Sequence, residues 1–400
     1  MKILIISYLF PPLNNPQSIL SARLVKYLKK LGQDIDVIAA NNVIDYESSH
    51  GEDESIKKEL KDVKIMYIND KNPSLLFKVF WSKLVNQEYY KYWVKRCIRF
   101  VKSNNEKYDI IYSLSAPHAS IVLGREVKKI LNIPLVVHFS DPGYIALKPK
   151  FKSKIKNLYL EGLENKIMED ASAITFVNSD TLEAMTKYST NIKTKSIIIP
   201  HFYDPDYFND YQNYNNDCIK NRIIFSYVGS LYGKRKPFNT ITALDTAFNC
   251  YRKDYQFNIY GNIERNIKNE IERIKNNKIN IVGSVSYIES IKAMVKSDYL
   301  ILIDMPDSNN LVTPSKLIDY MACKKPIIGI TAKNTNTYRI LNKIGYPCSD
   351  PNDINYQVDI FKSIINTPLT VTSEHLSSLE KYNANVVIEN LVKYFEKLII

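Results

Sequence analysis

The sequence lacks several features that would place it in a particular class of protein. It has five cysteines in 400 residues, an odd number without a close pair, so it predicts neither a disulfide framework nor a CxxC metal site. This cysteine usage suits a reducing cytosol. No apolar stretch approaches the ~18 residues that a membrane-spanning helix requires. There is also no internal repeat and no long low-complexity tract. These absences leave ordinary globular domains in the cytoplasm as the expected organisation.

The N-terminal segment lacks the pattern of a signal peptide. Residues 1–10 contain one lysine and a short apolar run, which ends at Pro11 and Pro12. A signal peptide has a longer apolar run followed by a small-residue cleavage site. We therefore expect residues 2–7 to form a buried first strand.

Acidic residues are fewer than basic ones. There are 42 Asp and Glu against 54 Lys and Arg, a net charge of +12. This balance favours an anionic partner such as nucleotide phosphates, a phospholipid surface or nucleic acid. We discount part of this positive charge, because the chain is rich in Lys, Asn, Ile and Tyr together. A biased coding composition would produce that combination without selection for an anionic partner. The basic residues follow no motif that reads nucleic acid, so we do not expect nucleic acid to be the partner.

The length predicts two domains, and the 45% hydrophobic content lets each half bury a core. Short apolar runs alternate with helical patterns, which predicts an α/β fold with two doubly wound parallel sheets. In the first half, strands are expected at 2–7, 35–39, 63–68, 109–114, 134–139, 173–177 and 196–199, and helices at 16–31, 74–102, 118–131, 153–169 and 180–188. In the second half, strands are expected at 222–228, 256–260, 279–282, 299–303 and 326–330, and helices at 238–249, 264–276, 287–296 and 314–323.

The boundary between the halves is expected within residues 200–218, which are rich in Pro, Asp, Asn and Tyr and have no apolar period. This places the first domain at 1–200 and the second at 201–379. We consider that a last helix, at about 380–400, packs back across the first domain.

The segment TPSKLIDY follows the fourth expected strand of the second half. Thr313 is expected to cap a helix, and Pro314 to take its first position. The backbone N–H groups of Ser315 and Lys316 would then point out of the helix start, where the helix dipole favours an anion. Asp319, one turn further on, could accept hydrogen bonds from the two hydroxyls of a ribose. The alternative is an ordinary capped helix with a solvated Lys and Asp.

The segment GSLYGKRKP follows the first strand of the second half. Gly229 lets the backbone approach a ligand closely, and Ser230 with three adjacent cations suits a diphosphate. The alternative is a flexible basic surface turn. Two further turns, one at Gly261 and one from Gly283 to Val285, follow the next two strands. The second of these could bind a base through its backbone.

Together these segments resemble the GT-B glycosyltransferases, and within them the retaining family 4. The second half is similar in order through IIFSYVGSLYGKRKP, FNIYGN, INIVGSVSYIESIKAMVKSDYLILI and TPSKLIDYMACKKPII. The first half is similar through SYLFPPLNNPQSILSARLVKYLKKLGQDIDVIA, SLSAPHASIVLGREVKKILNIPLVVHFSDPGY and IIIPHFYDPDYF. The resemblance covers residues 1–345 and implies two Rossmann-like domains that face each other across a cleft. The first would bind the acceptor and the second the nucleotide-sugar.

The resemblance also implies roles for individual residues. In that family an Arg and a Lys after the first strand of the second domain neutralise the diphosphate, and Arg235 and Lys236 stand at those places. An acidic residue on the later helix holds the ribose, which here is Asp319. In the first domain, Asp141 and His118 are candidates for orienting the acceptor or contacting the sugar. Alternatively, Asp141 is a turn residue and His118 caps a helix.

The sequence departs from the family at three places. Asn14 and Asn15 replace the Gly-Gly of the first loop. Leu311 stands where the first carboxylate of a Glu-x7-Glu pair is found, while Asp319 fills the second place. Ser140 replaces the Arg of a DFRDPW stretch.

The implied reaction moves a sugar from a nucleotide-diphosphate-sugar to a glycan or polyprenyl-linked acceptor, with retention, in bacterial surface polysaccharide synthesis such as lipopolysaccharide or capsule. Cationic groups would neutralise the departing diphosphate, so no metal and no cofactor are expected. Two alternatives remain. One is a nucleotide-sugar epimerase, against which the few acidic cleft motifs argue. The other is a non-catalytic, glycosyltransferase-like binding protein.

Residues 75–102 read LLFKVFWSKLVNQEYYKYWVKRCIRFVK, with aromatic and basic side chains at helical spacing. Such a face would suit attachment to an anionic surface on the inner side of the plasma membrane. The lysines of 150–159 could extend it. The alternative is an ordinary helix with its apolar stripe in the core.

Three other histidines are expected in structural roles. His138 lies in a strand pattern and is expected in the core, whereas His50 and His375 are expected on the surface.

Overall fold

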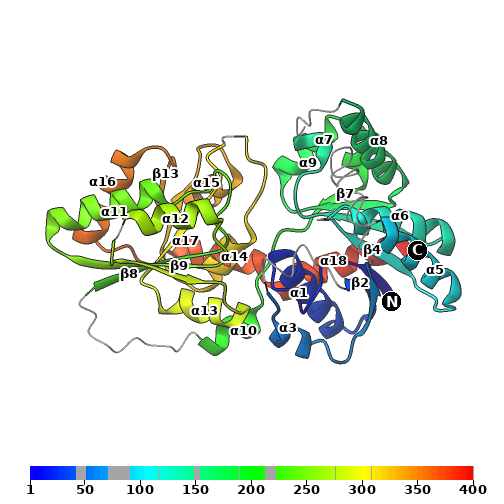
Figure 1. Ribbon diagram of the computed structural model, residues 1–400. Coiled ribbons are helices and arrows are strands. Elements are labelled where there is room, and N and C mark those ends of the chain that lie inside the picture. The colour runs from blue at the N-terminus through cyan, green and yellow to red at the C-terminus, as the bar shows by residue number, and fades with distance from the viewer. Residues whose placement is uncertain are drawn as a thin grey trace. The chain divides into compact units, whose positions relative to one another are not determined.

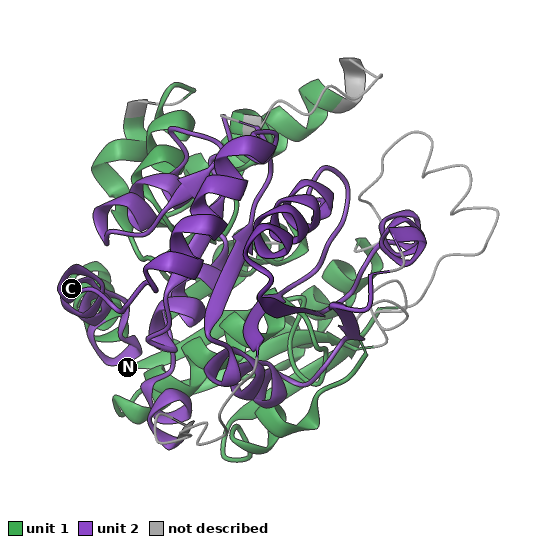
Figure 2. Cartoon of the chain, turned by 90° about the vertical axis from the view of Figure 1, so that its left-hand side faces the viewer, with its two compact units in different colours: residues 1–200, 387–400 green, residues 201–386 purple. Residues whose placement is uncertain are grey.

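The computed structural model describes residues 1–41, 51–70, 91–115, 117–147, 154–188, 190–211, 222–274, 276–307 and 309–399. The chain forms two compact units (Figure 2). Unit 1 comprises Met1–Pro200 with Val387–Ile400, and unit 2 comprises His201–Val386. Each unit has its own parallel β-sheet and its own hydrophobic core.

Unit 1 is built on a seven-stranded sheet with the order β3-β2-β1-β4-β5-β6-β7, in which all neighbours are parallel. Its strands are β1 (Lys2–Ile6), β2 (Asp34–Asn41), β3 (Lys64–Asn69), β4 (Ile110–Leu114), β5 (Leu135–Phe139), β6 (Ala173–Phe176) and β7 (Ser196–Ile198). The central strands β1, β4 and β5 are almost entirely buried, as expected for a parallel sheet with helices on both faces. The strand order reverses between β1 and β4, and ligands bind parallel sheets at the carboxyl edge beside such a reversal.

Helices α5 (Lys91–Ser103), α6 (Ala119–Leu131) and α8 (Lys154–Asp170) contribute to the main core of unit 1. The last helix, α18 (Ala384–Ile399), returns the chain to this unit. There, the ring of Phe395 lies 5.1 Å from that of Tyr112, and the Tyr394 hydroxyl donates to the carbonyl of Lys195 at 3.2 Å. Unit 1 also contains α1 (Pro16–Lys30), α3 (Glu54–Lys58), α7 (Tyr144–Leu147) and α9 (Ser179–Thr186).

Unit 2 is built on a six-stranded parallel sheet with the order β10-β9-β8-β11-β12-β13. Its strands are β8 (Arg222–Val228), β9 (Asp254–Tyr260), β10 (Ile279–Gly283), β11 (Tyr299–Ile303), β12 (Ile327–Ile330) and β13 (Cys348–Ser349). Here too the order reverses next to the first strand of the unit, between β8 and β11.

Helices cover both faces of this second sheet (Figure 1). Helices α11 (Phe238–Tyr251), α12 (Arg265–Ile274) and α16 (Ile354–Asn366) share a core with Phe225 and Phe257 of the sheet. Helix α13 (Tyr287–Lys296) lies on the opposite face, where Ser297 Oγ donates to Ser226 Oγ at 2.7 Å. Unit 2 also contains α10 (Pro205–Tyr211), α14 (Ser315–Ala322), α15 (Asn336–Lys343) and α17 (Ser373–Leu379).

The predicted fold class, two parallel α/β sheets, is confirmed, and every predicted strand is present. The two-residue strand β13 and helices α3, α7, α10, α15, α16 and α17 were not predicted. Helix α10 lies inside the segment predicted as a boundary, of which residues 212–218 fall outside the described part. For the helix predicted at 74–102, the structure describes only the part from Lys91 onward.

The histidine predictions have mixed outcomes. The surface prediction for His375 is wrong: its side chain is buried, with Nδ1 2.7 Å from the Tyr346 hydroxyl and Nε2 2.8 Å from the carbonyl of Met321. A single histidine has too little local context to reveal such long-range partners. His138 is half-buried, with Nδ1 2.9 Å from Thr175 Oγ1. His50 lies outside the described residues.

Candidate functional site

Three glycines lie together at the carboxyl ends of β8, β9 and β10. The backbone φ angle is 142° at Gly229, 116° at Gly261 and 89° at Gly283, and residues other than glycine rarely adopt such values. A Cβ atom on Gly261 would lie 2.4 Å from the carbonyl oxygen of Gly229, so the two turns touch through their backbones. The Gly261 N–H donates to the carbonyl of Gly283 at 2.7 Å. Because glycine has no side chain, no Cβ atom covers the backbone of these turns at the edge of the sheet.

Lys316, in the first turn of α14, extends to the same edge. Its Nζ donates to the Tyr227 hydroxyl at 2.7 Å and to the carbonyl of Ile303 at 3.4 Å. A Cβ atom on Gly229 would lie 3.2 Å from Lys316 Nζ, so the cation lies directly against the glycine turn. Burial lowers the pKa of Lys316 well below its ordinary value, and the nearby charge of Arg235 lowers it further.

Arg235 belongs to the same cluster, where it forms an ion pair with Asp304. Its Nη2 lies 3.2 Å from Asp304 Oδ1, and the two side chains are 11% and 0% exposed. Asp304 also accepts from the backbone N–H of Met305 and from the Thr337 hydroxyl, at 2.8 and 2.9 Å. Arg235 Nε is buried and has no hydrogen-bond partner within the described ranges. Asp304 was not predicted as a site residue, although it directly follows strand β11.

The charges of this cluster do not cancel. The positive charge of Arg235 is paired with Asp304, and a protonated Lys316 would add a second positive charge with no carboxylate of its own. Burial and the charge of Arg235 both disfavour the protonated form of Lys316, and a nearby anion would favour it. An anionic group with several oxygens would restore the balance and could accept hydrogen bonds from both cations.

The predicted start of α14 is corrected by one residue. The helix begins at Ser315, Pro314 is the cap residue, and no side chain caps this end. Thr313 does not cap: it is buried, and its hydroxyl accepts from Asn336 Nδ2 at 2.6 Å. Proline can stand at the cap because this position needs no N–H from it. The helix therefore still begins beside the cation cluster, at Ser315 and Lys316.

Asp319, a turn further along α14, is buried and accepts from the Tyr287 hydroxyl at 3.3 Å. Tyr287 is the first residue of α13, so Asp319 lies next to the turn that contains Val285, which is half-buried. Ser230 contributes its carbonyl to the cluster, where it accepts from the Tyr227 hydroxyl at 2.8 Å. Lys236 differs from Arg235: it is exposed, with Nζ 5.9 Å from the centre of the Phe238 ring.

The two candidates in unit 1 lie at the carboxyl ends of β4 and β5. Asp141 is exposed on the loop after β5. His118 is the cap residue of α6, but its side chain makes no capping bond. Its Nε2 instead lies 2.9 Å from Oε1 of Glu164, a fully buried residue of α8 that was not predicted. Glu164 is 46 positions away in the sequence, so no local pattern connects it to His118.

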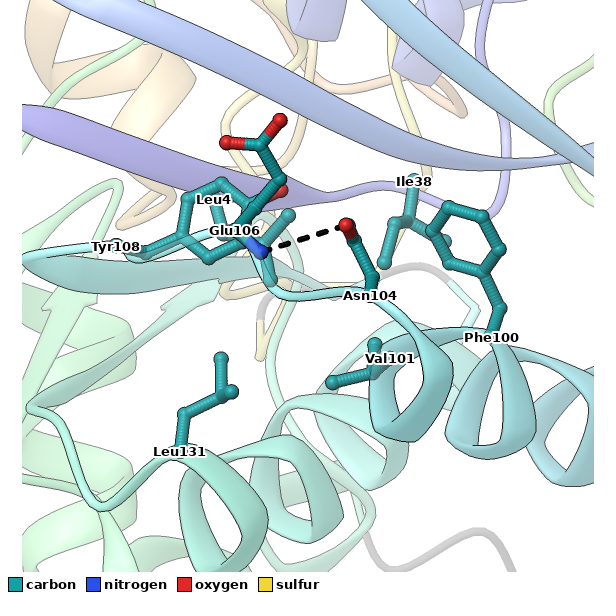
Figure 3. Close-up of a pocket in the computed structure, with 8 residues that line it drawn as sticks. All are labelled: Leu4, Ile38, Phe100, Val101, Asn104, Glu106, Tyr108 and Leu131. Atoms are coloured by element: carbon teal, nitrogen blue, oxygen red, sulfur yellow. Dashed lines mark hydrogen bonds between the residues drawn. The ribbon is translucent and has the colours of Figure 1, made fainter.

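A small pocket lies elsewhere in unit 1 (Figure 3). It is lined by Leu4, Ile38, Phe100, Val101, Asn104, Glu106, Tyr108 and Leu131. Its polar groups are already paired: Asn104 Oδ1 accepts from the Glu106 N–H at 3.4 Å, and Tyr108 donates to Asp36 at 2.8 Å. None of the predicted site residues lines it, so we regard it as a packing feature.

Among the described residues, no group of three or more His, Cys, Asp or Glu side chains is placed to hold a metal ion. Within the same ranges, no helix combines the length and apolar character needed to span a bilayer.

Comparisons with known proteins identify the fold. No model of a protein family matches the chain, and no curated protein matches it in sequence. Among solved structures, Anabaena HepE in complex with UDP and glucose has a TM-score of 0.71 at 14% identity, with 100% of both chains covered. The lipopolysaccharide outer core galactosyltransferase WaaB has a TM-score of 0.63 at 13% identity, again with 100% of both covered. A trehalose-6-phosphate synthase, studied for glycosyl transfer with retention, has a TM-score of 0.68 at 11% identity and 99% of both covered.

These likenesses extend over the whole chain and therefore concern both units. They confirm the GT-B architecture that the sequence resemblance implied. Because the sequence identities are 14% or less, these likenesses concern the fold alone.

Proposed function

We propose that this protein is a glycosyltransferase that moves a sugar from a nucleotide-diphosphate-sugar to a hydroxyl of a glycan or lipid-linked acceptor. The observation that carries the proposal is the pair of cations, Arg235 and Lys316, beside the glycine turns at the carboxyl edge of the unit 2 sheet. Parallel sheets bind phosphates and nucleotides at this edge, next to the reversal of strand order.

The cation pair suits the departure of a diphosphate. Breaking the bond between the sugar and the phosphate leaves negative charge on the diphosphate, and preorganised cations stabilise that charge most when they are shielded from water. Arg235 is held in place by Asp304, so it need not reorganise when the charge develops. We propose that the reaction needs no metal, since the cluster already supplies positive charge.

The nucleoside end is assigned to Asp319. A carboxylate can accept hydrogen bonds from the two hydroxyls of a ribose, and Asp319 lies beside Tyr287, the first residue after the glycine turn of β10. The binding of UDP by the Anabaena HepE protein supports a uridine nucleotide as the first donor to test.

We propose transfer with retention and an acceptor in bacterial surface polysaccharide synthesis. Support comes from the trehalose-6-phosphate synthase and from the lipopolysaccharide galactosyltransferase, which share this fold. Because the leaving phosphate can take the acceptor's proton on the same face, no enzyme nucleophile is required.

An anionic membrane surface is proposed as a further partner. Helix α5 buries Trp93 and Cys97 in the core while its other face exposes Lys91, Lys95, Arg99 and Lys102. The helix sequence contains no acidic residue. The apolar stripe and the basic face thus coexist on one helix, and such a face is attracted to anionic lipid.

The donor site is tested by nucleotide-sugar binding. Lys316→Met keeps most of the side-chain volume and removes the charge, whereas Lys268→Met removes a cation of unit 2 that is 50% exposed in its pair with Glu272. We expect at least one of the UDP-, GDP-, ADP- and dTDP-sugars to raise the melting temperature of the wild type and the Lys268 variant. The Lys316 variant should bind the same ligand roughly tenfold more weakly, by about 1.4 kcal/mol.

Calorimetry measures the dissociation constant of the nucleotide-sugar for each variant directly. Equal affinities in the two variants would remove the site assignment, and a wild type that binds none of the four donors would favour a non-catalytic protein. Conversion of a donor with no acceptor present would favour the epimerase.

A further inference from the structure

Glu164 occupies an unusual place for a carboxylate, since its side chain is 0% exposed. It lies in α8 and accepts three hydrogen bonds. Oε1 accepts from His118 Nε2 at 2.9 Å and from the Tyr144 N–H at 3.1 Å, and Oε2 accepts from the Ile145 N–H at 2.8 Å. These bonds offset the cost of burying a charge. They also join three segments of unit 1: the start of α6, the start of α7 and the middle of α8.

The backbone next to this carboxylate has room for glycine alone. A Cβ atom on Gly143 would lie 2.2 Å from Glu164 Oε1 and 2.5 Å from its Cδ. Gly143 is not among the glycines with positive φ, so space rather than backbone conformation requires glycine here. The loop that begins at Asp141 is therefore shaped around the Glu164 side chain.

The contact determines which nitrogen of His118 carries the proton. Both oxygens of the Glu164 side chain already accept from a backbone N–H, so we assign Nε2 of His118 as the donor in this contact, which leaves Nδ1 as the nitrogen that can accept. The ring centre lies 4.6 Å from that of Tyr144, which holds the imidazole from the side of the same loop. The His118 side chain is 15% exposed, so solvent or a ligand can reach it.

We propose that Glu164 is a positioning residue: it fixes the tautomer of His118 and the segment from Asp141 to Ile145, so that His118 Nδ1 accepts a hydrogen bond from a substrate hydroxyl. The proposal rests on the proposed glycosyltransferase function, in which both the sugar and the acceptor carry such hydroxyls. The arrangement follows a general pattern in which a buried carboxylate orients a histidine that acts on the substrate.

The first test is spectroscopic and needs no activity. Histidine labelled with ¹⁵N distinguishes protonated from bare ring nitrogens at about pH 8, where an ordinary imidazole is neutral. We expect the wild-type His118 signal, assigned by its loss in His118→Gln, to show a bare Nδ1. In Glu164→Leu it should show a mixture of tautomers. A proton on Nδ1 in the wild type, or an unchanged tautomer in Glu164→Leu, would overturn the proposal.

The second test uses the glycine contact and keeps the carboxylate itself. Gly143→Ala should displace the Glu164 carboxylate and lower kcat by roughly tenfold or more, with the donor KM within about twofold of wild type. The matched control is Gly162→Ala, because a Cβ atom there meets nothing within 4 Å. Glu164→Gln should recover part of the activity lost in Glu164→Leu, because its amide oxygen can still accept from His118.

These outcomes separate the two proposals. A wild-type kcat in Gly143→Ala would overturn the role of Glu164, and so would a loss of donor binding equal to the loss of kcat. If the wild type binds no nucleotide-sugar, the proposed function fails, while the tautomer measurement still decides the arrangement of Glu164 and His118.

Discussion

At the scale of single residues, the two cations of the unit 2 cluster are in different situations. Arg235 has a carboxylate partner, Asp304, whereas Lys316 donates to a neutral hydroxyl and a carbonyl. The unbalanced charge therefore belongs to Lys316. Binding of an anionic diphosphate is expected to raise the pKa of Lys316 again, because a nearby negative charge favours its protonated form.

Replacing Arg235 by alanine should affect both stability and transfer. The change leaves Asp304 buried without its cation, so we expect a loss of about 3 kcal/mol in the free energy of unfolding by urea. We expect the transfer rate to fall by more than about tenfold, because diphosphate stabilisation is lost. Adding Asp304→Asn should restore much of the stability but not the rate. A double variant that also regains the wild-type rate would show that Arg235 serves structure alone.

The sequence predicts some of these residues and not others, for a physical reason. Arg235, Lys316 and Gly261 follow strands or begin a helix, so local pattern and their order along the chain identify them. Asp304 and Tyr227 act through partners 69 and 89 positions away, and no local signal reports a side-chain contact of that range.

At the scale of elements, helix α14 is held at both of its ends. Its first turn is tied to strand β8 through Lys316 and Tyr227. Near its last turn, the carbonyl of Met321 accepts from Nε2 of His375, and the Tyr346 hydroxyl donates to Nδ1 of the same ring. Because a carbonyl can only accept, Nε2 of His375 carries a proton, and in the neutral ring Nδ1 accepts from the Tyr346 hydroxyl.

This histidine should make the stability of the protein depend on pH. Burial lowers the pKa of His375 below its ordinary value of about 6.5, so below that pH the unfolded chain binds a proton that the folded chain does not. The stabilisation is complete above about pH 6.5 and is lost as the pH falls towards the lowered pKa.

Urea unfolding between about pH 5 and 8 measures the effect. We expect His375→Gln to remove part of the wild-type slope of unfolding free energy against pH. Tyr346→Phe is the matched control, because it removes a hydrogen bond and keeps the titrating ring. A slope that is unchanged in His375→Gln would contradict the assignment.

Strands were easier to predict than helices in this chain. Each predicted strand is a short apolar run, because parallel strands are buried on both faces. Helix α16 has a comparable signal, with Val358, Phe361 and Ile365 at helical spacing and all buried. Strand β13 has only two residues, too few to show any period.

At the scale of the whole molecule, the proposed chemistry predicts independence from divalent metals. The positive charge that a metal would bring is already provided by Arg235 and Lys316. We expect the transfer rate to be the same with and without EDTA. Loss of the rate in EDTA and its recovery with Mn²⁺ would contradict the metal-free proposal.

The basic face of α5 predicts binding to anionic vesicles. Lys95→Glu with Arg99→Glu should weaken co-sedimentation with phosphatidylglycerol vesicles at least tenfold, since each cation near an anionic surface contributes about 1 kcal/mol. The control, Lys268→Glu with Lys393→Glu, makes the same change in net charge at other exposed lysines. Equal binding by the two double variants would mean that net charge, and not this face, governs adsorption.

The return of the chain to unit 1 along α18 has a consequence for the order of folding during synthesis. Phe395 is fully buried against Tyr112, so the first 200 residues leave part of their apolar surface uncovered when they emerge from the ribosome. Unit 2 is complete once residue 386 has been made, whereas unit 1 must wait for the segment that follows. The half of the protein that is translated first is therefore the last to be finished, and in the interval its exposed surface is a natural target for chaperones.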